Sequence, residues 1–133
     1  MMHRYVKFLI VFSVMLMSPP LFANDAEIVA AEFHKNGGSW SVNVTLRHAD
    51  SGWKHYADGW RVVDASGKIF GTRTLYHPHV DEQPFTRSLS GVKIPANVTE
   101  VYVEAHDKVH GWNKVKLKVD LSKTSGDSYR VMQ

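Results

Sequence analysis

The stretch Trp40-Ser41-Val42-Asn43-Val44-Thr45-Leu46-Arg47 alternates apolar and polar residues without interruption. Successive side chains of an extended chain point to opposite faces, so this alternation places all of its apolar side chains on one face. The stretch therefore predicts a β-strand over about 39–48 with one buried and one exposed face. His48 follows in phase with the apolar face, and we expect its side chain to point into the end of the core.

The same period of two recurs on both sides of this stretch, and no apolar spacing of 3.6 residues is long enough to predict a helix after residue 26. Turn-forming sequences such as Asn36-Gly37-Gly38 separate the alternating segments. Seven short strands at this spacing predict an all-β fold, a seven-stranded β-sandwich. Besides 39–48, the expected strands are about 26–34, 57–64, 67–76, 84–93, 98–106 and 112–121.

The last expected strand and the end of the chain differ in character. In 112–121 the side chains of Val115, Leu117, Val119 and Leu121 are expected to face inward. The remaining residues, 122–133, are mostly polar, and we expect a flexible tail there. The sequence thus predicts one β-sandwich domain over 24–121.

Two segments resemble parts of the immunoglobulin-like and fibronectin type III-like pattern. Trp60 stands where that pattern has a core tryptophan in its third strand, and residues 101–107 (VYVEAHD) are similar to its sixth strand. The resemblance implies an immunoglobulin-like (fibronectin type III-like) sandwich. It implies no activity, because one fold can carry many functions.

The first 23 residues have the layout of a cleaved signal peptide. Arg4 and Lys7 precede an apolar run over 8–17, and small residues and prolines follow up to Ala23. The apolar run is shorter than the roughly 20 residues that a membrane-spanning helix needs. We therefore expect a signal peptide over 1–23, a mature chain that begins near Asn24 and does not span a membrane, and a periplasmic or secreted location.

Charge and cysteine content exclude some classes of protein. Removing Arg4 and Lys7 from the 16 basic residues leaves 14 against 13 acidic ones, a net charge of +1. A nearly neutral chain lacks the basic surface of a nucleic-acid-binding protein. The chain has no cysteine, so we expect neither disulfides nor a blue-copper centre.

Histidines are distributed unevenly along the expected strands. In an up-and-down succession of seven strands, the second, fourth and sixth connections lie at the same end of the sandwich. Those connections and the strand ends beside them contain every histidine after residue 23 except His34; they are His48, His55, His77, His79, His106 and His110. We expect these imidazoles to gather at one end of the domain.

Local spacing favours a metal site at that end. His77 and His79 flank a proline that favours extended geometry, and His106 and His110 border a short loop. Imidazoles with carboxylates, and no thiolates, suit Zn²⁺ or Cu²⁺. The expected metal ligands are His77, His79, His106, His110 and His55. His48, Asp58 and Asp107 are expected to orient them through hydrogen bonds.

The expected function is that of an exported metal buffer, carrier or accessory protein, whose partners are a metal ion and another exported protein. The alternative is an interaction module that contacts a protein or a glycan without metal, through loops that contain Trp53, Tyr56, Tyr76 and Trp112. No GxSxG sequence for a serine nucleophile occurs, and no general base stands out. Binding is therefore expected rather than catalysis, although zinc-dependent hydrolysis stays open.

Three segments also resemble a group of small exported bacterial proteins of uncharacterised function. They are GWKHYADGW (52–60), HPHVDEQPFTRSLSGVKIP (77–95) and AHDKVHGW (105–112). The resemblance implies an exported, stand-alone domain and brings no catalytic assignment. It adds emphasis to His55, His77, His79, His106 and His110.

Overall fold

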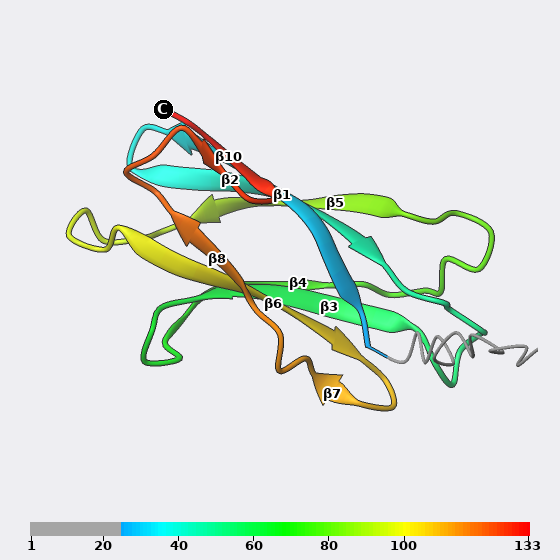
Figure 1. The fold of residues 1–133 in the computed structure, drawn as a ribbon. Coiled ribbons are helices and arrows are strands. Elements are labelled where there is room, and N and C mark those ends of the chain that lie inside the picture. The colour runs from blue at the N-terminus through cyan, green and yellow to red at the C-terminus, as the bar shows by residue number, and fades with distance from the viewer. Residues whose placement is uncertain (1–24) are drawn as a thin grey trace, which may run out of the picture.

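Two β-sheets packed face to face make up the described part of the chain (Figure 1). The structure is a computed structural model that describes residues 25–133. These residues form ten strands rather than the seven that were predicted, and the predicted all-β sandwich is confirmed. The predicted signal peptide lies outside the described residues. Within 25–133, no helix has the length and apolar character needed to cross a membrane.

The first sheet is built around the strand that the opening alternation predicted. Its spatial order is β5 (Phe85–Val92), β2 (Ser39–Arg47), β1 (Glu27–Asn36), β10 (Tyr129–Met132) and β9 (Ser125–Gly126). β2 pairs antiparallel with both β1 and β5. β10 lies parallel to β1, with Phe33 opposite Val131.

The second sheet carries the other strands. Its order is β4 (Ile69–Thr74), β3 (Ala57–Val63), β6 (Glu100–Asp107) and β7 (Gly111–Trp112), and β8 (Leu117–Asp120) also pairs with β6. β3 pairs antiparallel with both β4 and β6. Inward-facing side chains of the two sheets form one core between the layers, in which Val42, Leu46, Trp60 and Val103 are fully buried.

The expected strand over 112–121 is corrected to two short strands, β7 and β8. His106 pairs with Trp112, and Val103 pairs with Leu117. Between these two pairs, three steps along β6 match five steps along the segment from Trp112 to Leu117. The two extra residues of that segment therefore loop out of the sheet. Val115 lies in this excursion and is 75% exposed, which contradicts its predicted inward direction, whereas Val119 is buried as predicted.

The expected flexible tail over 122–133 is also corrected. β9 and β10 belong to the first sheet, and Val131 is buried in the core. The edge of β1 offers unpaired backbone groups that β10 satisfies. The segment Tyr129–Met132 is too short for its own pattern to predict a strand, and its pairing depends on the edge that β1 offers.

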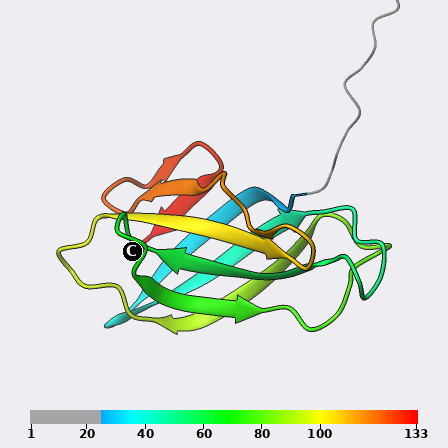
Figure 2. The ribbon, with the colours of Figure 1, turned by 90° about the horizontal axis from the view of Figure 1, so that it is seen from below.

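Three connections meet at one end of the sandwich, as predicted (Figure 2). They are the loops between β2 and β3, between β4 and β5, and between β6 and β7. The His79 N–H donates to Asp50 Oδ2 at 2.8 Å, which joins the first two loops. The Lys108 N–H donates to the Tyr56 carbonyl at 3.1 Å, which joins the first and the third.

Candidate metal centre

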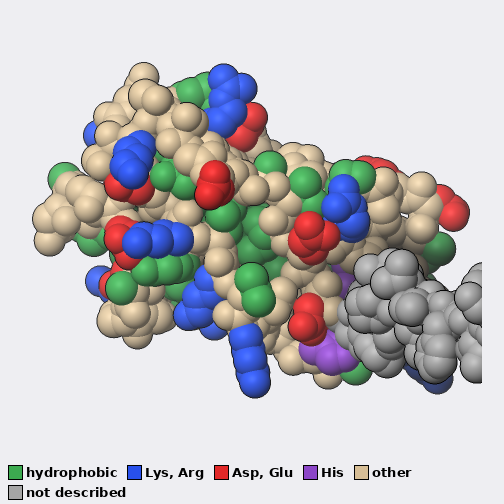
Figure 3. Space-filling view, in the orientation of Figure 1, with side chains coloured by type: hydrophobic (Ala, Val, Ile, Leu, Met, Phe, Trp, Pro, Cys, Tyr) green, Lys and Arg blue, Asp and Glu red, His purple; other side chains and the backbone are tan. Residues whose placement is uncertain are grey.

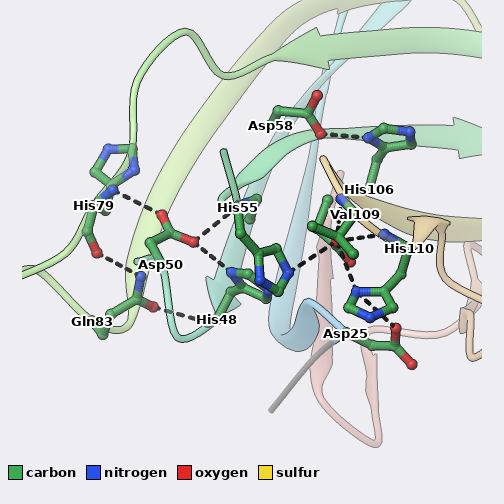
Figure 4. A network of polar contacts seen from close by, with 12 residues as sticks. Asp25, His48, Asp50, His55, Asp58, His79, Gln83, His106, Val109 and His110 are labelled. Atoms are coloured by element: carbon green, nitrogen blue, oxygen red, sulfur yellow. Dashed lines mark hydrogen bonds and ion pairs between the residues drawn. The ribbon is translucent and has the colours of Figure 1, made fainter. Parts of the chain in front are cut away.

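A buried carboxylate, Asp50, organises the centre of this end. Asp50 Oδ1 lies 2.5 Å from His48 Nδ1 and accepts the Ala57 N–H at 3.0 Å, while Oδ2 accepts the His79 N–H (Figure 4). Both His48 and Asp50 side chains are fully buried. Burying a carboxylate is costly unless hydrogen bonds compensate, and here they come from three segments. The predicted inward direction of His48 is confirmed.

The contact with Asp50 determines how the His48 ring presents its nitrogens. A carboxylate accepts hydrogen bonds, so Nδ1 donates to Asp50, and Nε2 is the ring nitrogen that faces away from Asp50. The ring lies 4.7 Å from that of His55, centroid to centroid. Gln83 holds the segment in place, because its Oε1 accepts the His48 N–H at 3.0 Å and its Nε2 donates to the His79 carbonyl at 2.9 Å.

Asp107 is the second buried carboxylate, at the end of β6. Its Oδ1 accepts the backbone N–H groups of Val109 at 2.9 Å and His110 at 2.8 Å. The same oxygen lies 3.2 Å from His55 Nε2 and 3.0 Å from His110 Nδ1. Burial alone would raise the pKa of Asp107, but the hydrogen bonds from His110 and Val109 outweigh it and lower the pKa. The lowered pKa favours the carboxylate form of Asp107, which is the form that binds a metal ion.

His55 Nε2 is a buried atom that makes no hydrogen bond of acceptable geometry within the described residues. Its distance of 3.2 Å from Asp107 Oδ1 is nevertheless short. Two ligand atoms on one tetrahedral zinc ion stand about 3.3 Å apart, given bonds of about 2.0–2.1 Å. The pair is thus spaced as two ligands of one ion are spaced.

Two groups of side chains bring their ligand atoms within 4.8 Å of one another. The first consists of His48, His55 and Asp107, and the second of Asp25, Asp107 and His110. Histidine and acidic side chains also reach the surface side by side at this end (Figure 3). These are the groups of three or more that could hold a metal ion among residues 25–133.

His77 and His79 form a separate contact. Their rings lie 4.7 Å apart, and the His79 ring stacks on Phe85 at 4.0 Å. His79 Nε2 accepts from the Arg87 guanidinium at 2.8 Å, so an ion at this nitrogen would have to displace a cation. Burial, together with Arg87 and His77, lowers the pKa of His79 and so favours the neutral ring.

His106 is engaged elsewhere as well. Its Nδ1 contacts Asp58 Oδ1, and its ring meets the edge of Trp112 with the centroids 4.9 Å apart. Asp58 therefore holds the His106 imidazole, but this pair belongs to neither three-residue group.

Of the five expected ligands, the structure brings His55 and His110 together, with ring centroids 5.2 Å apart. It joins them to His48 and Asp107, which were expected to play supporting roles. Sequence reasoning missed Asp25 and Asp50. The position of Asp50 two residues after a histidine in the apolar phase was an available signal, whereas nothing in the sequence near Asp25 indicated its contact with His110.

Comparisons with known proteins place the chain beside one relative. It is similar to a protein of Halomicrobium mukohataei described as "Putative lipoprotein", with 36% identity over 110 residues. The alignment covers 82% of this chain and 53% of that protein, so the chain spans about half the length of the relative. No family model and no solved structure matches the chain.

Proposed function

We propose that this protein is an exported metal-binding protein that holds a divalent transition-metal ion between His48, His55 and Asp107. The observation that carries the proposal is the convergence of the three ligand atoms within 4.8 Å, with a buried His55 nitrogen that lacks a good hydrogen bond. Export is supported by the signal-like residues 1–23 and by the lipoprotein description of the relative.

The donor set favours Zn²⁺ or Cu²⁺. Two imidazoles and a carboxylate leave a fourth position of a tetrahedral ion open to water or to a group from another molecule. The hydrogen bond from His48 to Asp50 is the kind of contact that orients a metal-binding imidazole. Because the His55 side chain is 21% exposed, an ion bound there could exchange with solution, as a buffer or carrier requires.

A second candidate function is contact with a protein or a glycan through the same loops. Trp53 is 68% exposed and Tyr76 is 77% exposed, and both lie on connections at the histidine end. Large exposed aromatic side chains are typical anchors of binding surfaces. This function needs no metal, which separates it from the first.

Titration of the purified protein with Zn²⁺ and with Cu²⁺, followed by calorimetry, tests the metal proposal. We expect binding that the His55→Gln substitution abolishes. At an ion concentration of about 100 Kd, binding should stabilise the fold by about 2.7 kcal/mol and raise the melting temperature. The matched control is His34→Gln, since His34 contacts Glu32 on β1 and belongs to neither three-residue group.

Two results would contradict this assignment. Absence of binding by the unsubstituted protein would remove the metal function and favour the second candidate. Binding that survives His55→Gln but is lost in His79→Gln would move the site to the His77 and His79 pair.

A further inference from the structure

Asp107 faces an imidazole nitrogen on each of two neighbouring loops. His55, from the loop before β3, approaches Oδ1 with its Nε2 at 3.2 Å, and His110, from the loop after β6, approaches it with Nδ1 at 3.0 Å (Figure 4). The contact of His110 Nδ1 is a hydrogen bond that an ion would replace, and both separations are close to the roughly 3.3 Å between two ligands of one tetrahedral ion. The carboxylate is therefore placed to serve two coordination positions.

Asp25 completes the second position. Its Oδ1 lies 3.9 Å from His110 Nδ1, so that this nitrogen stands between two carboxylates. The three ligand atoms of Asp25, Asp107 and His110 lie within 4.8 Å of one another, as those of the first group do. Asp25 thus adds a carboxylate to the one that Asp107 shares between the two positions.

We propose that the protein binds a second divalent cation between Asp25, Asp107 and His110, so that Asp107 bridges two ions. The proposal rests on the proposed function, because the first ion lies between His48, His55 and Asp107. Both imidazoles and two backbone N–H groups face Oδ1 of Asp107, so the two ions would replace the imidazole contacts at that oxygen and would use the lone pairs of Oδ2 as well. Ions in such paired sites stand about 3.5–4 Å apart.

The two positions differ in accessibility and in composition. His48 and Asp107 are buried, whereas the Asp25 side chain is 59% exposed and that of His110 is 33% exposed. The first position has two imidazoles and one carboxylate, and the second has one imidazole and two carboxylates. We therefore expect the second ion to bind more weakly and to exchange more readily than the first.

The competing arrangement is a single ion held by His55, His110 and Asp107 together. Titration with Cu²⁺, followed by both calorimetry and electron paramagnetic resonance, distinguishes the two. Two ions per chain are expected, and the resonance of isolated Cu²⁺ seen at one equivalent should lose intensity at the second equivalent, because ions this close couple magnetically.

Asp25→Asn should reduce the stoichiometry from two ions to one and preserve the isolated Cu²⁺ resonance. Glu27→Gln is the matched control, since it removes the same charge from an exposed residue two positions away that pairs with Arg47. The inference is overturned if the unsubstituted protein binds one ion only, or if Glu27→Gln lowers the stoichiometry as much as Asp25→Asn. A result of no ions at all would instead refute the proposed function.

Discussion

Asp50 shows how much of this site depends on one side chain. Its two oxygens receive hydrogen bonds from the His48 ring and from the backbone of Ala57 and His79. These residues belong to the loops before β3 and before β5 and to the start of β3 itself. A single buried carboxylate therefore both joins the loops and orients a candidate ligand.

Substituting Asp50 with Asn should affect both stability and metal binding. The amide keeps one acceptor oxygen but loses the charge, and hydrogen bonds to charged groups each contribute about 1.5–3 kcal/mol. We expect unfolding in urea to show a loss of about 2–3 kcal/mol. Loss of such an orienting contact also typically weakens metal affinity by about 10–100-fold.

Asp81→Asn is the control for this substitution, because Asp81 is exposed on the loop between β4 and β5. It removes the same charge from the same end of the domain. If both variants are equally stable and bind metal equally well, Asp50 does not organise the site.

At the scale of elements, β10 is one of two strands, with β9, that sequence reasoning did not anticipate. It lies parallel to β1, and its Val131 is 4% exposed within the core. The Val131 N–H also donates to the Thr124 carbonyl at 2.9 Å, which folds the preceding segment back onto the strand. The end of the chain is therefore part of the sandwich.

Val131→Ala should destabilise the domain as a core truncation does. Removing buried methyl groups costs the transfer free energy of the lost atoms and leaves a cavity, about 1–3 kcal/mol for a valine. Val115→Ala, at a 75% exposed position, should change stability by less than about 0.5 kcal/mol. Chemical denaturation of the two variants checks the difference, and equal effects would mean that β10 does not pack on the core.

At the scale of the whole molecule, the outer face of the second sheet is held by a buried acid. Glu104 on β6 accepts from Arg61 Nε on β3 at 2.6 Å and from Lys116 Nζ, in the excursion between β7 and β8, at 2.9 Å. Burial would raise the pKa of Glu104, but the hydrogen bonds from Lys116 and Arg61 outweigh it and lower the pKa. The carboxylate thus links three segments of one sheet.

This lowered pKa predicts how stability depends on pH. The unfolded chain takes up a proton at Glu104 near the ordinary value of 4.5, whereas the folded protein does so only at lower pH. The contribution of Glu104 is therefore complete above about pH 4.5 and is lost as the pH falls through the folded pKa. Urea unfolding at a series of pH values from about 3 to about 7 gives the free energy of unfolding as a function of pH. On the acid side of this curve, Glu104→Gln should show a shallower slope than the unsubstituted protein.

Glu32→Gln provides the comparison, since the side chain of Glu32 on β1 is 41% exposed. Its acid-side slope should match that of the unsubstituted protein. An unchanged slope in Glu104→Gln would show that the ion pairs of Glu104 contribute nothing to acid stability.

The sequence by itself determined the strand from Trp40 to Arg47 and the end of the domain where the histidines gather. The pattern from Trp40 to Arg47 became β2, with its apolar side chains buried. Alternation is a local property of an extended chain, and the order of strands along the chain decides at which end each connection lies. Both could be read before any contact was known.

Only the tertiary structure decided which imidazoles come together, where the segment between β7 and β8 loops out beside β6, and what covers the edge of β1. His79 turns to Phe85 and Arg87, while His55 turns to Asp107, although both histidines lie on converging loops. The direction of a loop side chain depends on the hydrogen bonds and packing that distant segments offer. Spacing along the chain carries no information about those partners.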